Sequence, residues 1–237
     1  MLQLDSPLRR LPKDIDPKHA FYLDGLRHAA EIASLAWERL LETLTEMADA
    51  MRREEASDAH HAAAFLDAWC IVDAVDRFRT LWKKAPFGPT EVGDCTFWEV
   101  TEQLRKVRNV GDHPTELVDH ILSADTGALG TLHWLTLDDV DPAAGSICLL
   151  KPGFLPSVQI DFGDLSRLNI DTTRRTSAVR LQAGKNTADL SETMAHLKAR
   201  VEHLENALAG QFAGTAETER APSDLLACAT FRAPQTL

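Results

Sequence analysis

The chain lacks the features that mark membrane, secreted and disulfide-bonded proteins. No apolar run in its 237 residues approaches the roughly 20 residues that a bilayer-spanning helix needs. The first residues, MLQLDSPLRRLPKD, lack the apolar stretch of a secretory signal. The four cysteines are widely spaced and form no CxxC pair, so neither a structural zinc site nor a disulfide framework is expected. We therefore expect a soluble, cytoplasmic protein with no membrane partner.

Positive charge is also scarce. The 25 Lys and Arg residues are outnumbered by 36 Asp and Glu residues, which gives a formal net charge of −11. Such a chain repels nucleic acid at long range, so any binding of RNA would have to depend on a local site. The proportions of hydrophobic residues (44%) and charged residues (26%) are typical of a globular protein, and the length suits one large domain or two small ones.

Two long helices are predicted in the first third of the chain. Asp16 followed by Pro17 is a helix-start signal, an N-cap acceptor before a residue that needs no donor. Apolar residues then recur at steps of three and four as far as Met51. Residues 62–84 are apolar around most of the helical circumference, which is typical of a central helix in a bundle.

Two shorter helices are predicted next. Thr96 with Glu99 three residues later is a capping-box pattern, and this third helix should end at or near Gly111. Pro114 suits the first position of a fourth helix, PTELVDHILSAD, which makes His113 its N-cap or a neighbour of the N-cap. Residues 17–125 are thus expected to form a helical bundle.

The second half of the chain changes to short alternating segments. TLHWLTL, SICLL, SVQIDF and SAVRL predict a small antiparallel sheet within residues 126–186. A last helix is predicted over residues 187–209, with a narrow apolar seam that packs either on the bundle or on a second subunit. We expect residues 1–16 to be an irregular lead and residues 210–237 a flexible tail. The expected fold is mainly α (α+β), an antiparallel helical bundle with a small sheet.

The stretch RNVGDHP, residues 108–114, contains two residue types that suit cleavage of RNA without a metal ion. Histidine titrates near neutral pH, so His113 can exchange a proton with a ribose hydroxyl or with a leaving oxygen. Arg108 stays charged and grips phosphate with a planar fork. On an unbroken helix the two would point about 140° apart. Either a helix break at Gly111 and Pro114 brings them together, or they meet across a two-fold axis between subunits.

RNVGDH resembles the signature of the HEPN superfamily, which is an Arg, usually a polar residue, three variable residues and a His at the end of a helix. The resemblance covers about residues 17–125. It implies a helical bundle that dimerises with the motifs facing each other. The residues that it implies for the site are the catalytic pair Arg108 and His113, with Asn109, Asp73 and Arg77 in supporting positions.

From this resemblance we expect a metal-independent endoribonuclease, such as a toxin or an antiviral defence effector. The expected partners are an RNA substrate, a second copy of the chain and an antitoxin or regulatory protein, with no cofactor, no metal and no DNA. The alternative is a HEPN module that has lost catalysis and binds a partner protein, a nucleotide or RNA. Some family toxins are modified on a Tyr two residues after the His. That position is Thr115 here, so this form of control is not expected.

The same residues also have purely structural interpretations. Basic residues near a helix end can pair with its free carbonyl groups, which accounts for Arg108 and His113 without catalysis. Asp73 and Arg77 have the spacing of an ordinary helix ion pair. Trp69 lies among apolar residues at helical spacing, so core packing is expected for its ring rather than stacking on a base.

Overall fold

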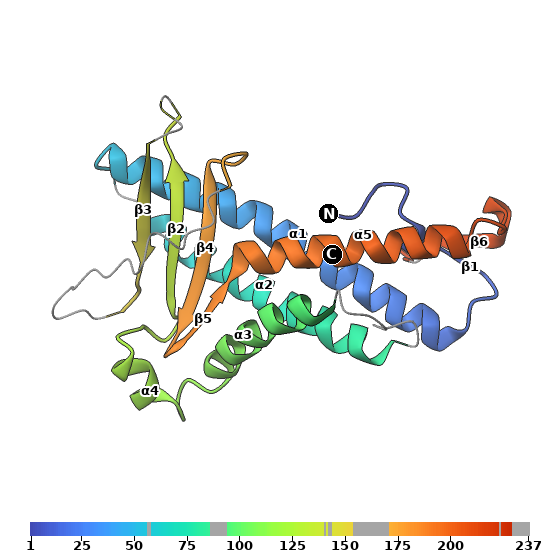
Figure 1. Cartoon of the computed structure of the whole chain (residues 1–237), viewed down its shortest axis with the longest axis horizontal. Helices are drawn as coiled ribbons and strands as arrows, with labels where there is room; N and C mark the ends of the chain where they lie inside the picture. Colours follow the sequence, from blue (N-terminus) through green and yellow to red (C-terminus); the bar gives the residue numbers. More distant parts are fainter. Residues whose placement is uncertain are drawn as a thin grey trace, which may run out of the picture.

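The computed structural model describes residues 1–55, 58–85, 94–139, 141, 144–153, 171–222 and 224–228. Helices dominate this part of the chain, with two antiparallel sheets beside them, so the prediction of a mainly α fold with some β is confirmed. In Figure 1 the long helices run side by side, the larger sheet caps one end, and a two-stranded sheet lies at the other. None of the helices described is long and apolar enough to cross a membrane.

The first two helices form an antiparallel pair at the centre of the contacts between helices. Helix α1 spans Pro17–Arg52, and the Asp16 carboxylate accepts from the amides of Lys18 at 2.9 Å and His19 at 3.2 Å, so the predicted N-cap is confirmed. Helix α2 spans Asp58–Lys84. Gly25 allows close approach, since a Cβ there would lie 2.7 Å from a methyl group of Leu81.

The third helix ends close to Gly111 as predicted, whereas the fourth begins later than predicted. Helix α3 spans Asp94–Asp112 and so continues through Gly111 before it ends nearby. Pro114–Leu117 form turns, and α4 is limited to Val118–Ser123. The fourth helix therefore does not begin at Pro114. The amide of Leu117 donates to the carbonyl of His113 at 3.1 Å, which makes one helical turn there, and the assigned helix follows.

The larger sheet has the strand order β3-β2-β4-β5, all antiparallel. Three predicted strands are confirmed as β2 (Thr131–Leu137), β3 (Gly145–Leu150) and β4 (Thr176–Ala183). The predicted strand SVQIDF lies outside the described residues. Strand β5 (Asn186–Asp189) occupies the first residues of the predicted last helix, so that helix, α5, spans Leu190–Gln211.

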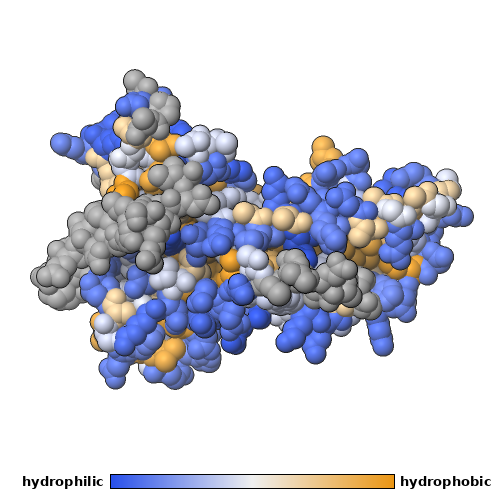
Figure 2. Space-filling view, viewed as in Figure 1, coloured by the Kyte–Doolittle hydropathy of each residue, from blue (hydrophilic) through white to orange (hydrophobic). Residues whose placement is uncertain are grey.

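One continuous core joins the sheet to the helices rather than separating them into modules. Buried side chains of β2 and β4, such as Trp134 and Leu181, belong to the same cluster as the apolar stripes of the helices. The seam of α5 is buried within this chain, so its packing partner is the bundle. Its members are Leu190, Met194, Leu197, Val201, Leu204 and Leu208. The face in Figure 2 is mostly hydrophilic, with apolar side chains in small groups.

The two ends of the chain pair with each other. A 3-10 helix (η1, Pro7–Arg9) leads into β1 (Arg10–Pro12), and a second one (η3, Glu217–Glu219) leads into β6 (Arg220–Pro222). Strands β1 and β6 pair in antiparallel register. The lead expected to be irregular thus contains a strand, and the tail expected to be flexible supplies its partner.

Candidate functional site

Arg108 is held near the end of α3 by carboxylates of the neighbouring helix. Its Nε donates to Asp73 Oδ1 at 2.9 Å, and its Nη1 donates to Asp76 Oδ2 at 2.7 Å. Asp73 and Asp76 are three apart on α2, so both face α3. Asp112, four residues after Arg108 on α3, lies 3.7 Å from Nε. The Arg108 side chain is nevertheless 38% exposed to solvent.

The electrostatics of this cluster are dominated by negative charge. The hydrogen bond to Asp73, aided by the charges of Asp112 and Asp76, raises the pKa of the Arg108 guanidinium against the opposing effect of burial. Three carboxylates thus surround one guanidinium. Nε and Nη1 are occupied, and among the described residues no hydrogen bond to Nη2 is formed. Nη2 is therefore the atom on which a further acceptor can bind.

Arg77 is near this cluster without pairing with Asp73. The two residues are four apart on α2, as expected for an ordinary helix ion pair, but the Asp73 carboxylate binds Arg108. Within the described ranges, Arg77 makes no ion pair, and its side chain lines a groove together with Asp73. The interpretation of Asp73 and Arg77 as an ordinary ion pair is therefore not supported by the contacts.

His113 is the first residue after α3, and its side chain is exposed. The imidazole makes no hydrogen bond and no ion pair with any residue that the structure describes. Its charge contributes to the lowered pKa of Glu116, after the larger effects of a backbone hydrogen bond and of the Thr115 hydroxyl. Asn109 is exposed on the last turn of α3. The His113 ring is therefore accessible to solvent and could exchange a proton with a bound ligand.

The hydrogen bonds and ion pairs of Arg108 among the described residues go to Asp73, Asp76 and Asp112, and none joins it to His113. The residue that shares the helical face of Arg108 is Asp112, four positions on, because α3 remains helical to that point. The helix ends after Asp112, so the break comes at His113, two positions beyond Gly111, and no break at Gly111 turns His113 back onto that face. Of the two arrangements that the sequence leaves open, the one that depends on a break at Gly111 is not formed in this chain, and the intersubunit one stays a prediction.

Gly111 has a packing role that its sequence context does not reveal. A Cβ at this position would lie 2.4 Å from the Trp69 ring, so the absence of a side chain lets the indole of α2 lie against α3. The Trp69 Nε1 also donates to the carbonyl of Leu129 at 3.1 Å, beyond α4. Trp69 therefore ties three segments around the motif together.

A groove of about 520 Å³ runs beside this cluster. It is lined by Ala29 and Ile32 of α1, by residues of α2, and by Leu129. It is mainly apolar, and Asp73 and Arg77 are its charged residues. The α2 residues that line it are Ala62, Phe65, Leu66, Trp69, Cys70, Asp73, Ala74 and Arg77. Because Asp73 also binds Arg108, the groove and the motif adjoin.

One group of potential metal ligands is found among the described residues, away from Arg108. Ligand atoms of Asp24, His28 and Asp224 lie within 4.8 Å of one another. The guanidinium of Arg27 occupies the position between these three side chains. Its Nη2 lies 2.5 Å from Asp224, 2.7 Å from His28 and 3.0 Å from Asp24. A cation could bind there only if the guanidinium left, so these residues form an ion-pair cluster.

Comparison with known protein families, with curated proteins and with solved structures finds no match for this chain. The candidate site therefore depends on its own geometry. Sequence reasoning missed Asp76, although its place three residues after Asp73 on one helix face was a usable signal. It also missed the contact between Trp69 and Gly111, for which the sequence has no signal.

Proposed function

We propose that this protein is a metal-independent endoribonuclease of HEPN type. The observation that supports it most is the contact between Asp73 and Arg108 at 2.9 Å. The resemblance implies an acidic residue on the helix before the motif, and this contact joins that residue to the motif arginine. The accessible imidazole of His113 and the partly exposed guanidinium of Arg108 are the two chemical groups that the reaction needs.

In this proposal the site forms between two copies of the chain, with His113 of one copy facing Arg108 of the other. One imidazole accepts the proton of the ribose 2′-hydroxyl, and the 2′-oxygen attacks phosphorus. The bond from phosphorus to the 5′-oxygen breaks, and the protonated imidazole returns its proton to that oxygen through water. Arg108 stabilises the charge that develops on the phosphoryl oxygens. The products are a 2′,3′-cyclic phosphate end and a 5′-hydroxyl end.

The carboxylates around Arg108 predict a selective enzyme. A phosphate that approaches Nη2 also meets the charges of Asp73, Asp76 and Asp112, so generic RNA should bind weakly. A defined substrate, such as a structured loop, can offset this repulsion with contacts elsewhere. Such selectivity suits a toxin or defence effector that acts under the control of an antitoxin or another regulatory partner.

The test is cleavage of structured and unstructured RNA in the presence of EDTA, followed by analysis of the ends. Wild type should produce 2′,3′-cyclic phosphate ends, and His113→Ala should lose activity by a factor of about 10² or more. His203→Ala, which changes an exposed histidine on α5, is the matched control and should retain activity. Absence of cleavage by wild type, or equal cleavage by His113→Ala, would refute the proposal.

The alternative function is a non-catalytic HEPN module that binds a partner protein, a nucleotide or RNA. The observation that favours it is that Arg108 already has two strong carboxylate partners, one of them, Asp76, with a side chain only 10% exposed. Expression in a host separates the two functions. The ribonuclease should slow growth and His113→Ala should not, whereas a binding module predicts no difference between them.

A further inference from the structure

The two charged residues that line the groove both have polar atoms available to a ligand. Asp73 uses Oδ1 to bind Nε of Arg108 at 2.9 Å, and among the described residues its Oδ2 accepts no hydrogen bond. Arg77 is exposed and makes no ion pair within the same part of the chain. The two residues are four apart on α2, so they are neighbours on one face of that helix. A carboxylate and a guanidinium therefore face the groove side by side.

The rest of the groove suits a flat ring. Its volume of about 520 Å³ lies in the range of pockets that hold small molecules, roughly 300–1,000 Å³. In its lining, Ile32 is 43% exposed and Leu66 is 63% exposed, and the half-buried Trp69 adds an aromatic ring. Apolar walls with a few convergent polar groups are typical of a ligand site. A ring with apolar faces and polar edges fits such a groove.

The pair of charges determines which edges that ring must have. The Asp73 carboxylate only accepts hydrogen bonds, and the Arg77 guanidinium only donates them. Guanine offers neighbouring donors at N1 and N2 on one edge and neighbouring acceptors at O6 and N7 on another, and arginine binds the latter pair bidentately. Adenine has a single donor group, its N6 amine, and the pyrimidines have no N7. Guanine is therefore the base that satisfies both side chains.

The position of the groove beside Arg108 gives such a base a role. Helix α2 contacts α1, with which it lines the groove, and α3, which carries Arg108. Asp73 belongs to both places. A base bound at Asp73 would bring a phosphate of the same strand close to Nη2 of Arg108. Its contacts would offset the repulsion between that phosphate and the carboxylates around the arginine.

We infer that the groove binds an unpaired guanine of single-stranded RNA. The Asp73 carboxylate accepts from N1–H and the N2 amine, Arg77 donates to O6 and N7, and the apolar lining covers the faces of the ring. A paired guanine has its N1 and N2 groups engaged, so the base must come from a loop or a free strand. The choice of RNA rests on the proposed function, whereas recognition of guanine does not require cleavage.

The experiment measures binding with probes that cannot be cleaved. Fluorescein-labelled pentanucleotides UUGUU, UUAUU, UUCUU and UUUUU carry 2′-O-methyl groups throughout, so no 2′-hydroxyl is present to attack phosphorus. Fluorescence anisotropy in EDTA gives the dissociation constants. We expect UUGUU to bind about tenfold or more tightly than the other three, which is the discrimination of one good bidentate pair.

Modified guanines and matched protein variants test each contact separately. Inosine lacks the N2 amine, and 7-deazaguanine lacks N7, so each should bind about tenfold more weakly than guanine. Arg77→Gln should weaken UUGUU by about tenfold and make the 7-deaza change ineffective, because both remove the same contact. Lys84→Gln, which removes an exposed charge from the last turn of α2, should retain the affinity and the preference for guanine.

The other results overturn the inference. Equal binding of the four probes, or a guanine preference that Arg77→Gln leaves unchanged, would show that these side chains do not read a base. No binding of any probe, as expected if a second copy of the chain covers the groove, would do the same. Displacement of UUGUU by guanosine monophosphate as effectively as by unlabelled UUGUU would identify the ligand as a free nucleotide instead of RNA. Because no probe is cleaved, failure here and failure of the proposed ribonuclease are distinguishable.

Discussion

Two arginines of this protein are each surrounded by three carboxylates, and they differ in exposure. Arg27 has Asp24, Glu31 and Asp224 as partners, and its side chain is 2% exposed. Arg108 has Asp73, Asp76 and Asp112, and its side chain is 38% exposed. The Arg27 guanidinium is buried and is held in place by its partners, whereas the Arg108 guanidinium is partly accessible to solvent. The same set of ion pairs is thus structural in one place and accessible to a ligand in the other.

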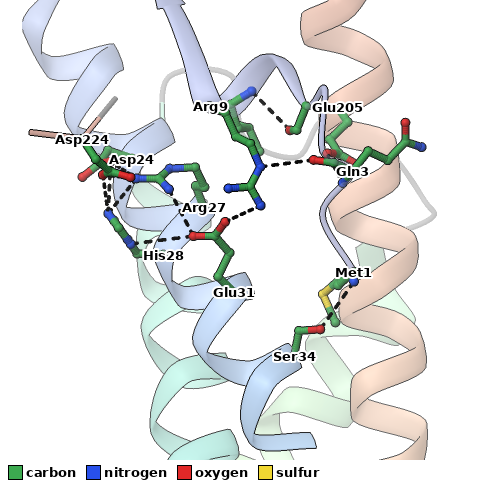
Figure 3. Close-up of polar contacts among 12 residues, drawn as sticks. Met1, Gln3, Arg9, Asp24, Arg27, His28, Glu31, Ser34, Glu205 and Asp224 are labelled. Atoms are coloured by element: carbon green, nitrogen blue, oxygen red, sulfur yellow. Dashed lines mark hydrogen bonds and ion pairs between the residues drawn. The ribbon is translucent and has the colours of Figure 1, made fainter. Parts of the chain in front are cut away.

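The surroundings of the Arg108 cluster are also more open than those of the Arg27 cluster. Around Arg27, both chain ends converge on α1, because Arg9 from the N-terminal lead binds Glu31 at 2.7 Å and Asp224 comes from the C-terminal part (Figure 3). Beside Arg108 there is a groove and the exposed His113. An ion-pair cluster by itself therefore does not indicate a site. A candidate site is indicated when a reactive side chain and an accessible surface lie beside the cluster, as they do at Arg108.

The largest effect on stability is expected from Arg27→Met. The substitution keeps most of the side-chain volume and leaves three carboxylates without their central cation. We expect the free energy of unfolding to fall by about 3 kcal/mol, the lower end for breaking a buried ion pair, because the carboxylates stay partly hydrated. Urea denaturation measures it. A loss below about 1 kcal/mol would show that this cluster resembles a surface ion pair.

Gly111→Ala tests whether packing or helix termination explains the glycine. Because a Cβ would lie 2.4 Å from the Trp69 ring, we expect a loss of about 1–3 kcal/mol from overpacking. If the residue served only to weaken the helix, alanine would instead stabilise the protein by up to about 1 kcal/mol. The sign of the change in unfolding free energy separates the two explanations. Adding Trp69→Phe should recover part of the loss.

Arg108→Met is the matched counterpart of Arg27→Met. The guanidinium and its partner Asp73 are partly hydrated, which weakens that ion pair, but the substitution also leaves the Asp76 carboxylate, 10% exposed, without its partner. We expect the free energy of unfolding to fall by about 1–2 kcal/mol, less than for Arg27→Met, measured under the same urea conditions. A loss as large as that of Arg27→Met would mean that Arg108 is structural, and would favour the non-catalytic function.

The smallest effect concerns pH and the contact between Asp224 and Arg27. The hydrogen bond from Arg27 lowers the pKa of Asp224 below its ordinary value of 3.8. The contribution of a lowered carboxylate pKa is complete above that ordinary value and is lost as the pH falls through the lowered pKa. Limited proteolysis should therefore find residues near Asp224 protected at pH 5 and above, and cleavable in more acidic solution. Asp224→Asn should be cleaved equally at both pH values.

Local patterns predicted most of the helices and three strands, because caps and periodicity depend on nearby residues. The Asp16 cap and the stripe of α1 are examples. The pairing of β1 with β6 could not be predicted, since each strand has three residues and their partners lie at opposite ends of the chain. Strand β5 was missed for a similar reason, because its four residues continue directly into α5.

The candidate site was predicted only in part. Arg108 and His113 follow from the motif, and Asp73 from its position on the preceding helix. The closeness of Asp73, Asp76 and Arg108 depends on how α2 and α3 pack, which local sequence does not determine. The same holds for Trp69 against Gly111 and for Asp224 against Arg27, which are contacts between segments far apart in the chain.

The central claim is that Arg108 and His113 of two copies form one ribonuclease site, and complementation tests it most directly. Arg108→Ala and His113→Ala chains are assayed separately with RNA in EDTA, then unfolded together, refolded as a mixture and assayed again. We predict that each variant alone is nearly inactive and that the mixture regains cleavage, because mixed dimers contain one intact Arg108 facing one intact His113. An active wild type with a mixture that stays inactive would contradict the intersubunit site, and an inactive wild type would contradict the ribonuclease itself.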